Sequence, residues 1–430
     1  MQLSDDFIAQ TRLLFGEQRF ERFVNALGEE PPVSIRLNPR KKVCSSTLTA
    51  SDAVAQVPWC PSGIYLNSRP NFTFDPLFHA GCYYVQEASS MFVDLVLRQY
   101  VNEPVAMLDM CAAPGGKSTA ARSVLPEGSV LVSNEPIRLR AQVLTENIQK
   151  WGYPDCIVTN NYPKDFRKVK ALFDVILCDV PCSGEGMFRK DEGAVGEWST
   201  QNVEKCWQLQ RSIVSEAWQC LAEGGLFIYS TCTYNTKEDE ENVRWMTDEL
   251  GAEVLPVDIM TPWNITSSLL EGFNQPVYRF IPGYTRGEGL FMAVLRKPGT
   301  PRSSDPRNLQ SVSTNICKAL NVLYDGQPKA EKKGHDLIPV HAEALSVLLD
   351  RDKYPMAELD YPTAIAYLRG EAISLPSDMP RGYIIVTFHR HPLGFVKNIG
   401  NRANNLYPKE WRIKSTHIPD YPDILKTTLE

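Results

Sequence analysis

The chain has 430 residues, of which 43% are hydrophobic and 22% charged, and its net charge is −6. This composition is typical of a folded protein and excludes a largely disordered one, while the length allows about three domains. Asp5 and Asp6 stand where a signal peptide requires a basic lead, and no apolar run approaches the roughly 20 residues of a membrane span. We therefore expect a cytoplasmic protein without a membrane partner.

The 11 cysteines are an odd number and contain no CxxC pair of the kind found in zinc sites. We predict no metal site and no disulfide framework. In a reducing compartment most of these thiols are expected to be small buried hydrophobic groups. Cys182 and Cys232 require a separate account, given below.

Residues 1–80 are expected to form an N-terminal helical and RNA-binding region. The apolar residues of 1–30 follow a helical period, and the following segment PVSIRLNPRKK is a short strand that ends in basic residues. Residues 59–75 are rich in Pro, Asn, Ser and Gly and are predicted to be loops.

From residue 81 to 298 short apolar strands alternate with helical segments. The predicted strands are 105–110, 129–135, 156–161, 173–181 and 225–233. Such alternation indicates an α/β fold with a parallel sheet covered by helices on both faces, which binds ligands at the carboxyl ends of its strands. Near residue 290, VYRFIPG and GLFMAVLRK are predicted to pair as an antiparallel hairpin.

Residues 299–375 are expected to be a linker with helices, and residues 376–430 a small β-rich module. Residues 381–414 contain seven Lys and Arg but one acid, Glu410, so this acidic protein has a basic end. Clustered basic residues favour phosphate contacts, although a solvated basic surface remains the alternative. His389 and His391 are expected to lie on the surface or contact RNA, since no further ligands accompany them.

The loop CAAPGGKST follows the first predicted strand of this sheet. It is not a phosphate-binding P-loop, because that motif requires glycine where Cys111 stands. Gly115 and Gly116 instead let a ligand approach the backbone closely. Glu135, at the end of the next strand, is placed to bind ribose hydroxyls. We favour a nucleoside cofactor over the alternative, a plain turn with a surface glutamate.

Two further loops, DVPCSGEGMFRK and STCTYNTKEDEENV, follow the fourth and fifth predicted strands. They place Cys182, Cys232 and Asp179 at the ligand-binding edge of the sheet. A free thiol titrates near about 8.5, and nearby positive charge lowers its pKa and makes the sulfur a nucleophile. Lys117, Arg189 and Lys190 are candidates for that charge. The residues alone leave open a pair of structural thiols.

These three motifs, in this order after successive strands, resemble those of the Nop/Sun family of RNA 5-methylcytosine methyltransferases. SIRLNP and YYVQEASSM resemble the family's segments that lead into the catalytic domain, so the resemblance covers about residues 30–298. It implies a Rossmann-like class I methyltransferase domain and S-adenosylmethionine as cofactor.

The resemblance also implies a role for each site residue. Cys232 matches the nucleophile, Cys182 the cysteine that assists product release, and Asp179 an acid beside both cofactor and target base. Glu135 matches the ribose-binding acid, and Asn161 stands where relatives often have an acid near the adenine. The cofactor loop corresponds to Cys111, Ala112, Ala113, Pro114, Gly115, Gly116 and Lys117.

Such chemistry explains the need for a thiolate. Carbon 5 of cytosine is too weak a nucleophile to attack a methyl sulfonium unaided. Addition of a thiolate to carbon 6 makes carbon 5 enamine-like, and an acid such as Asp179 stabilises the charge that develops on the ring. A second thiol assists the release that follows.

The segment from residue 382 to 413 resembles the PUA-like RNA-binding end of the bacterial RsmF group, which modifies small-subunit (16S) ribosomal RNA. This implies ribosomal RNA or the 30S subunit as the partner of a protein that need not be more than a monomer. Two alternatives remain: the same reaction on transfer RNA, and an RNA-binding ribosome assembly factor without catalysis. Deletion of residues 376–430 is expected to weaken RNA binding and to spare cofactor binding.

Overall fold

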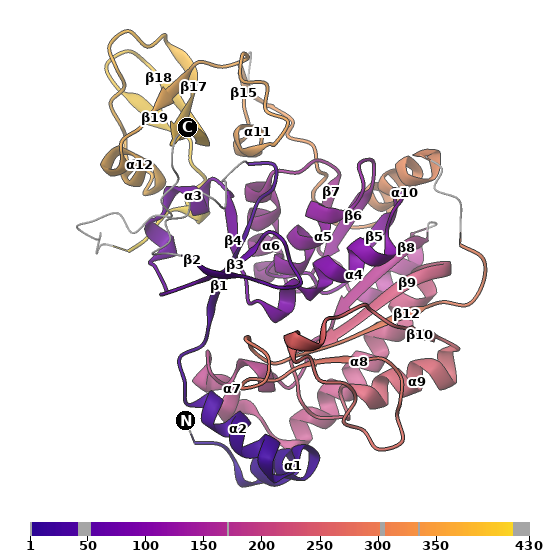
Figure 1. Ribbon diagram of the computed structural model, residues 1–430. Coiled ribbons are helices and arrows are strands. Elements are labelled where there is room, and N and C mark those ends of the chain that lie inside the picture. The colour runs from indigo at the N-terminus through magenta and orange to yellow at the C-terminus, as the bar shows by residue number, and fades with distance from the viewer. Residues whose placement is uncertain (1, 42–52, 170–171, 302–305, 334–335, 416–430) are drawn as a thin grey trace.

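The computed structural model describes residues 2–41, 53–169, 172–301, 306–333 and 336–415. A nine-stranded sheet crosses the middle of the molecule, in the order β10-β12-β9-β8-β5-β6-β7-β13, and β11 pairs with β12 (Figure 1). Its strands are β5 (Ala106–Asp109), β6 (Val130–Asn134), β7 (Cys156–Thr159), β8 (Phe173–Asp179), β9 (Leu221–Thr231), β10 (Glu253–Leu255), β11 (Tyr278–Phe280), β12 (Leu290–Arg296) and β13 (Val322–Tyr324).

The central strands β7, β6, β5, β8 and β9 are parallel to one another. This confirms the predicted parallel sheet, and each of its five strands overlaps a predicted one. The expected hairpin is also confirmed, because β11 and β12 are antiparallel with Tyr278 opposite Met292. The edge strand β13 was not predicted; it comes from the linker region and pairs antiparallel with β7.

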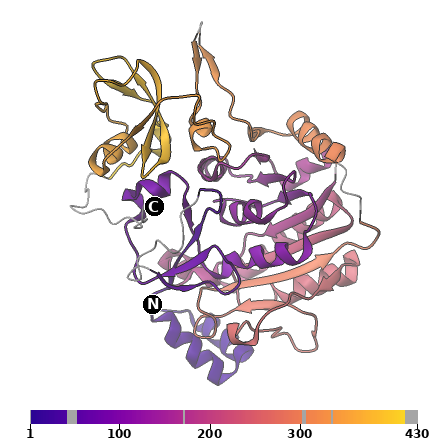
Figure 2. The same cartoon turned by 45° about the horizontal axis from the view of Figure 1, so that its top comes forward.

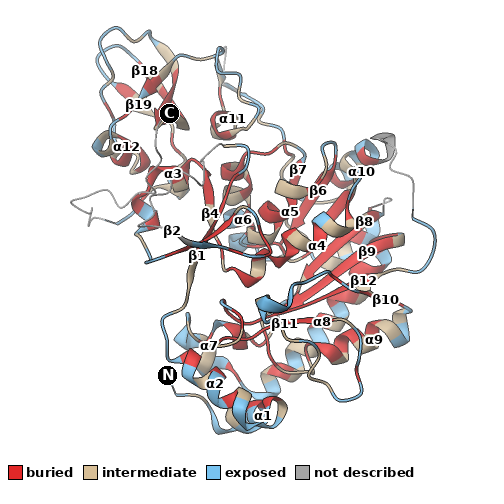
Figure 3. Cartoon of the chain, in the orientation of Figure 1, coloured by how far each residue is buried: buried red, intermediate tan, exposed pale blue. Residues whose placement is uncertain are grey.

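Helices cover both faces of the sheet, and each face buries its own apolar core (Figure 3). On one face pack α4 (Phe92–Tyr100), α5 (Gly116–Val124) and α6 (Arg138–Trp151). On the other pack α8 (Thr200–Cys220), α9 (Glu240–Leu250) and α10 (Pro306–Ala319). This double burial explains why the central strands are apolar throughout rather than alternating.

The N-terminal segment contains two helices, α1 (Asp5–Phe15) and α2 (Glu17–Leu27), separated at Gly16 with φ of 72°. Their aromatic side chains pack on Phe188 and Tyr234 of the catalytic domain. A four-stranded sheet follows, in the order β2-β3-β1-β4. Its elements are β1 (Val33–Leu37), β2 (Ala53–Gln56), β3 (Gly63–Leu66), the short helix α3 (Pro76–His79) and β4 (Tyr83–Val85). The prediction of loops throughout 59–75 is wrong for β3, whose apolar residues pair with β1.

The C-terminal module is a sheet of β16 (Met356–Glu358), β17 (Gly382–Phe388), β18 (His391–Asn398) and β19 (Ala403–Asn405), with α12 (Tyr361–Leu368). The module lies beside α3 and the N-terminal sheet (Figures 1 and 2). The two regions share one apolar core, in which Ile35 and Leu77 belong to the same cluster as Ile384 and Tyr407. The remaining elements are α7 (Glu192–Glu197), β14 (Glu331–Lys333), β15 (Asp336–Ile338) and α11 (His341–Leu345).

Among the described residues no helix is long and apolar enough to cross a membrane. The same part of the chain contains no group of three His, Cys, Asp or Glu that could hold a metal ion. His389 and His391 lie at the turn between β17 and β18, and His389 has a positive φ of 49°.

Candidate active site

A cleft of about 400 Å³ opens at the carboxyl ends of β5, β8 and β9. The strands bring their following loops together there because they are parallel neighbours. The predicted site residues that line it are Cys111, Ala112, Ala113, Pro114, Gly116, Lys117, Asp179 and Cys232.

The cofactor loop turns sharply between β5 and α5. Gly115 has a φ of 113°, a conformation that residues with a Cβ rarely adopt. Gly115 itself does not line the cleft; it makes the turn that brings its neighbours Pro114 and Gly116 to the cleft wall. Gly116 and Lys117, at the start of α5, line the cleft, and the first N–H groups of a helix have no partner within the helix.

Asp179 is held on both carboxylate oxygens. Lys117 Nζ lies 2.7 Å from Oδ2, and the Ser230 hydroxyl donates to Oδ1 at 2.6 Å. Burial alone lowers the pKa of Lys117, but the Asp179 carboxylate more than offsets this and the pKa is raised. Lys117 therefore remains charged at neutral pH, and its contact with Asp179 links the cofactor loop to the Pro-Cys loop.

The two predicted cysteines meet in the site. The Sγ atoms of Cys182 and Cys232 are 2.9 Å apart, and the Cys232 backbone N–H points to Cys182 Sγ at 3.4 Å. Contact with Cys232, together with burial, raises the pKa of the Cys182 thiol well above its usual value. Cys182 is therefore a protonated thiol at neutral pH, whereas Cys232 lines the open cleft.

A buried carboxylate, Glu238, joins the two cysteine loops. It accepts hydrogen bonds from the backbone N–H of Ser183 at 3.0 Å, from Gln210 Nε2 at 2.7 Å and from Asn235 Nδ2 at 2.9 Å. Burial, and then repulsion from Glu185, raises the pKa of Glu238 to about 7. Each donor belongs to a different element, so this carboxylate fixes the relative position of the loops that carry Cys182 and Cys232.

A second buried group anchors the residues on either side of Cys232. The hydroxyls of Thr231 and Thr233 donate to Asp239 Oδ1 at 2.6 and 2.9 Å. Asp239 in turn lies 3.0 Å from Arg279 Nη2 on β11. The loop that presents Cys232 is thus fixed on both sides of the sulfur.

Of the two other predicted basic residues, only Lys190 lines the cleft. Arg189 is buried beneath it, 2.9 Å from Glu288 Oε2, and donates to the carbonyl oxygens of Ala26 and Gly287. Arg189 therefore fixes the wall of the site instead of adding free positive charge to it.

Glu135 and Asn161 lie beside the cofactor loop, outside the cleft lining. Glu135 accepts from the Ile137 backbone N–H at 2.9 Å and lies 3.7 Å from Arg140, whose guanidinium also donates to Ala113 of the loop. The Asn161 amide makes two hydrogen bonds of 3.1 Å with the backbone of Asn321, in the segment that leads into β13. Contact of these two residues with ribose and adenine stays a prediction.

Two residues that sequence reasoning did not select, Asp109 and Gln86, have unpartnered polar atoms at the cleft. Asp109 Oδ1 and Gln86 Nε2 are buried without a hydrogen-bond partner, and both residues line the cleft. Burial raises the pKa of Asp109 to about 7, although the Ser118 hydroxyl donates to Oδ2 at 2.6 Å. The cleft therefore offers one free hydrogen-bond acceptor and one free donor, which suit a ligand that carries both a donor and an acceptor. Asp109 lies two residues before Cys111, the start of the quoted cofactor loop, and Gln86 lies within YYVQEASSM, so the signal stood beside the first motif and inside the second.

The SIRLNP segment attaches the N-terminal sheet to this site. The buried Arg36 donates to Gln86 Oε1 at 2.7 Å, to Thr119 Oγ1 at 2.6 Å and to the Gly116 carbonyl at 3.3 Å. Asn38 donates to the carbonyls of Gly81 and Trp151 at 3.0 Å. These side chains act structurally, by joining β1 to α5 and α6.

The chain matches three family descriptions. Residues 3–88 match the N-terminal domain of 16S rRNA methyltransferase RsmF, residues 95–296 match 16S rRNA methyltransferase RsmB/F, and residues 355–413 match the methyltransferase RsmF PUA domain. The last range begins at β16, before the residue 376 where the module was expected to start.

Curated relatives resemble the chain over most of its length. Ribosomal RNA small subunit methyltransferase F of Cronobacter sakazakii is 30% identical over 410 residues, which cover 82% of this chain and 84% of that protein. The protein of the same name from Erwinia tasmaniensis is 27% identical and covers 94% of this chain and 95% of its own length. A solved structure, NSun6 from Pyrococcus horikoshii with SFG, has a TM-score of 0.58 at 20% identity and covers 69% of this chain and 99% of that one, which shows a shared fold. The chain belongs to the RsmF family of 16S rRNA methyltransferases.

Proposed function

We propose that this protein methylates carbon 5 of a cytosine in 16S ribosomal RNA, with S-adenosylmethionine as the methyl donor and Cys232 as the covalent nucleophile. The observation that carries this proposal is the pair of sulfur atoms 2.9 Å apart, beside the ion pair of Asp179 and Lys117 in one cleft. The choice of ribosomal RNA rests on the names of the curated relatives.

The residues of the cleft fit S-adenosylmethionine. Its methionine part carries an ammonium, which the free Asp109 Oδ1 would accept, and a carboxylate, to which the free Gln86 Nε2 would donate. Pro114, Gly116 and Lys117 line the cleft, and we propose that this turn and Glu135 beside it bind the nucleoside. The related NSun6 structure holds SFG, an analogue of S-adenosylmethionine. When bound, the cofactor supplies an electrophilic methyl group.

Cys232 begins the reaction by forming a bond between its Sγ and carbon 6 of the cytosine. The electron pair of the double bond then becomes available at carbon 5, which takes the methyl group. We propose that Asp179, which Lys117 and Ser230 hold in place, accepts a hydrogen bond from the exocyclic amino group at the edge of the ring, while the Lys117 ammonium offsets the negative charge that thiolate addition places on the ring. The same ion pair keeps Asp179 oriented before the base arrives, so its alignment costs little during the reaction.

The product is released when the carbon 5 proton passes to a base and the bond between carbon 6 and Cys232 Sγ breaks. We propose that Cys182 assists this step, which its contact with Cys232 Sγ at 2.9 Å supports. Its raised pKa keeps it protonated and therefore prevents it from competing as the first nucleophile.

The test incubates labelled S-adenosylmethionine with 16S ribosomal RNA, with 30S subunits and with bulk transfer RNA. Wild type is expected to place label in 5-methylcytosine of ribosomal RNA. Cys232→Ala should form neither product nor adduct, and Cys182→Ala should accumulate an RNA–protein adduct. Cys206→Ala, a half-buried thiol on α8, is the matched control and should behave as wild type.

Label in transfer RNA alone would show that the substrate is transfer RNA and not ribosomal RNA. Cofactor binding without label in any RNA would favour an assembly factor and overturn the proposal. Full activity of Cys232→Ala would overturn the covalent mechanism even if 5-methylcytosine forms.

A further inference from the structure

A second hollow of about 390 Å³ lies between the end of α2 and the loop that joins β11 to β12. Tyr284, Arg286 and Gly287 of that loop form one side, and Ala26 and Glu29 form the other. None of the predicted catalytic residues belongs to it. We call it the α2 hollow.

The α2 hollow adjoins the catalytic cleft. Arg189 and Gly287 line the hollow, while the residues that follow them in the chain, Lys190 and Glu288, line the cleft. Arg189 fixes this shared wall through its ion pair with Glu288 and its hydrogen bond to the Gly287 carbonyl at 2.7 Å. Because consecutive residues line the cleft and the α2 hollow, we take them as neighbouring sites for consecutive units of one bound chain.

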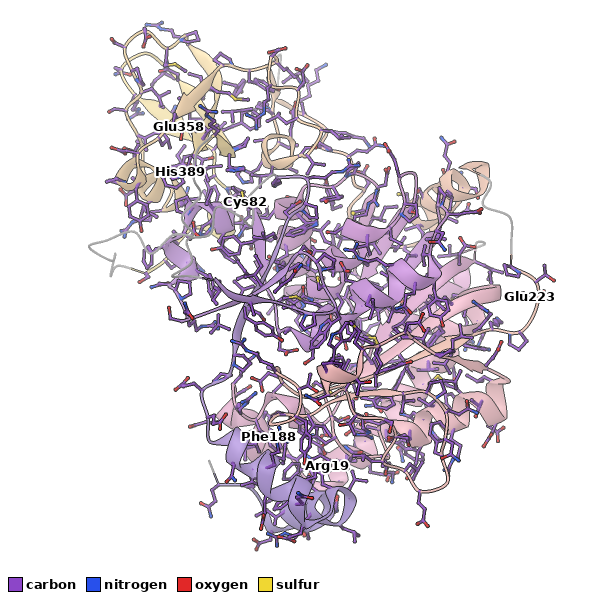
Figure 4. The ribbon with its side chains drawn as sticks, in the orientation of Figure 1. Arg19, Cys82, Phe188, Glu223, Glu358 and His389 are labelled. Carbon is purple, nitrogen blue, oxygen red and sulfur yellow. The ribbon has the colours of Figure 1, made fainter. Side chains whose placement is uncertain are left out.

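Guanidinium groups lie over aromatic rings around the α2 hollow. Arg22 lies 4.2 Å from the ring centre of Tyr284 and Arg19 lies 5.9 Å from it. Arg286 lies 4.2 Å from the ring centre of Tyr65, whose hydroxyl donates to the Arg286 carbonyl. Among the described residues none of these three arginines forms an ion pair with a carboxylate. Arg19 extends from the α1–α2 end of the molecule, where Phe188 packs beneath the helices (Figure 4).

These groups fit a single-stranded nucleotide. Unstacked bases bind on aromatic rings and on guanidinium planes, and unpaired arginines bind phosphate. Glu29 and Glu30 at the rim are exposed carboxylates that repel a bare polyanion. They can accept hydrogen bonds from base amino groups, so the hollow suits a base with its phosphate better than a duplex backbone.

We propose that the α2 hollow binds the nucleotide next to the target cytosine, with its base on Tyr284 and its phosphate near Arg19 and Arg22. The inference rests on the proposed function, because it takes the cleft as the place of the target base. A base that leaves its stack costs a few kcal/mol, and binding of the neighbouring nucleotide offsets part of that cost. The hollow therefore favours targets whose flanking nucleotide is also unpaired.

The test uses the full chain and a single-stranded fragment of 16S ribosomal RNA that wild type methylates. In two matched fragments an abasic residue replaces the nucleotide on the 5′ or the 3′ side of the target. Tyr284→Ala and Arg22→Ala should raise KM for the intact fragment about tenfold and leave kcat and cofactor affinity unchanged. Tyr284→Phe keeps the ring and should retain the wild-type KM.

One abasic fragment should remove the difference between wild type and Tyr284→Ala, which identifies the side that enters the hollow. Arg12→Ala is the matched control, because Arg12 lies 4.6 Å from the ring centre of Phe20 on the same helical pair, whereas Arg22 lies over Tyr284 of the hollow. An unchanged KM for Tyr284→Ala, or an equal loss on both abasic fragments, would overturn the inference.

Failure of the proposed function has a different signature, since wild type would then form no 5-methylcytosine in any RNA. In that case a single-stranded trinucleotide that contains 2-aminopurine tests the hollow alone. Fluorescence quenching by wild type but not by Tyr284→Ala would support a nucleotide site. Equal quenching, or none, would overturn it.

Discussion

Arg36 Nε donates to Gln86 Oε1 at 2.7 Å, and this contact fixes the orientation of the Gln86 amide at the cleft. Because the oxygen is engaged by the guanidinium, the amide nitrogen is the atom left without a partner. A residue of the N-terminal sheet therefore determines which atom of the Gln86 amide is free at the proposed cofactor site.

Replacement of Gln86 tests this polarity. Gln86→Leu keeps the volume but removes the donor, and it is expected to weaken S-adenosylmethionine binding about tenfold, the effect of one hydrogen bond to a charged group. Isothermal titration calorimetry measures the affinity, and the control is Gln99→Leu, at a half-buried glutamine of α4 whose amide bonds to the Asp258 backbone outside the cleft lining. Unchanged affinity of Gln86→Leu would show that the amide does not face the cofactor.

Cofactor affinity is expected to depend on pH through Asp109. Its pKa, raised to about 7 by burial, means that the ligand-free protein holds a proton there below pH 7. The cofactor ammonium favours the ionised carboxylate, so affinity should rise as pH rises through 7 and binding should release a proton. Calorimetry in buffers of different ionisation enthalpy counts the protons. A flat affinity from about pH 6 to 8 would contradict the assignment, and Asp109→Asn should abolish the dependence.

A rise in pH is expected to lower the stability of the ligand-free fold through the same carboxyl group, whereas it raises cofactor affinity. The folded protein binds a proton that the unfolded chain releases near its ordinary pKa of about 4. Asp109 therefore lowers the stability of the ligand-free protein as pH rises towards 7. Relative to wild type, Asp109→Asn should gain in Tm between about pH 5 and 7, as differential scanning calorimetry would show. A constant difference in Tm would contradict this.

The ion pair of Lys117 and Asp179 is expected to act on the chemical step. Lys117→Met leaves Asp179 without the partner at 2.7 Å that orients it, and kcat should fall on the order of a hundredfold, as for other lost groups that stabilise transition-state charge. Lys168→Met breaks an exposed pair with Asp165 of the same length and should leave kcat unchanged. Equal activity of the two variants, in single-turnover methylation, would remove Asp179 from the mechanism.

Loss of the Glu238 carboxylate should loosen both cysteine loops. Glu238→Ala leaves the donors of Ser183, Gln210 and Asn235 without an acceptor. We therefore expect the free energy of unfolding to fall by about 3 kcal/mol. We also expect the contact between Cys182 and Cys232 to be lost. Urea unfolding measures the first effect, and the yield of trapped RNA adduct measures the second. Glu249→Ala, exposed on α9 after the turn that carries Glu238, is the control.

The shared core changes the expected outcome of removing residues 376–430. Their apolar side chains pack with Ile35 and Leu77 of the N-terminal region, so the deletion should lower Tm as well as RNA affinity. Arg402→Ala and Lys409→Ala change exposed basic side chains and are the cleaner test. Each should reduce the salt dependence of RNA binding by about one unit of slope at unchanged Tm. An unchanged slope of the salt dependence would show that these basic side chains contact solvent and not RNA.

The parallel sheet and the meeting of the three loops could be predicted because each strand is a continuous apolar run. Once β5, β8 and β9 are known to be parallel neighbours, Cys182, Cys232 and Asp179 must approach one another. Gln86 could not be assigned in this way, since it follows a strand of a different sheet and reaches the cleft only through the packing of Arg36.

Other elements depend on contacts that local sequence does not reveal. Strand β3 lies in a Pro- and Ser-rich stretch, and its pairing with β1 decides its conformation. Strand β13 forms where the Asn161 amide bonds to the backbone of Asn321, a pairing across 160 residues. Tertiary context of this kind overrides local propensity.

The common core of the two ends of the chain also sets the order of events during synthesis. His79 contacts Tyr407 across a separation of 328 residues. At about 5–20 residues per second, the ribosome needs roughly 16–66 s to supply the second half of that contact. The nascent N-terminal sheet is exposed throughout this interval, and we expect chaperones to bind its apolar face.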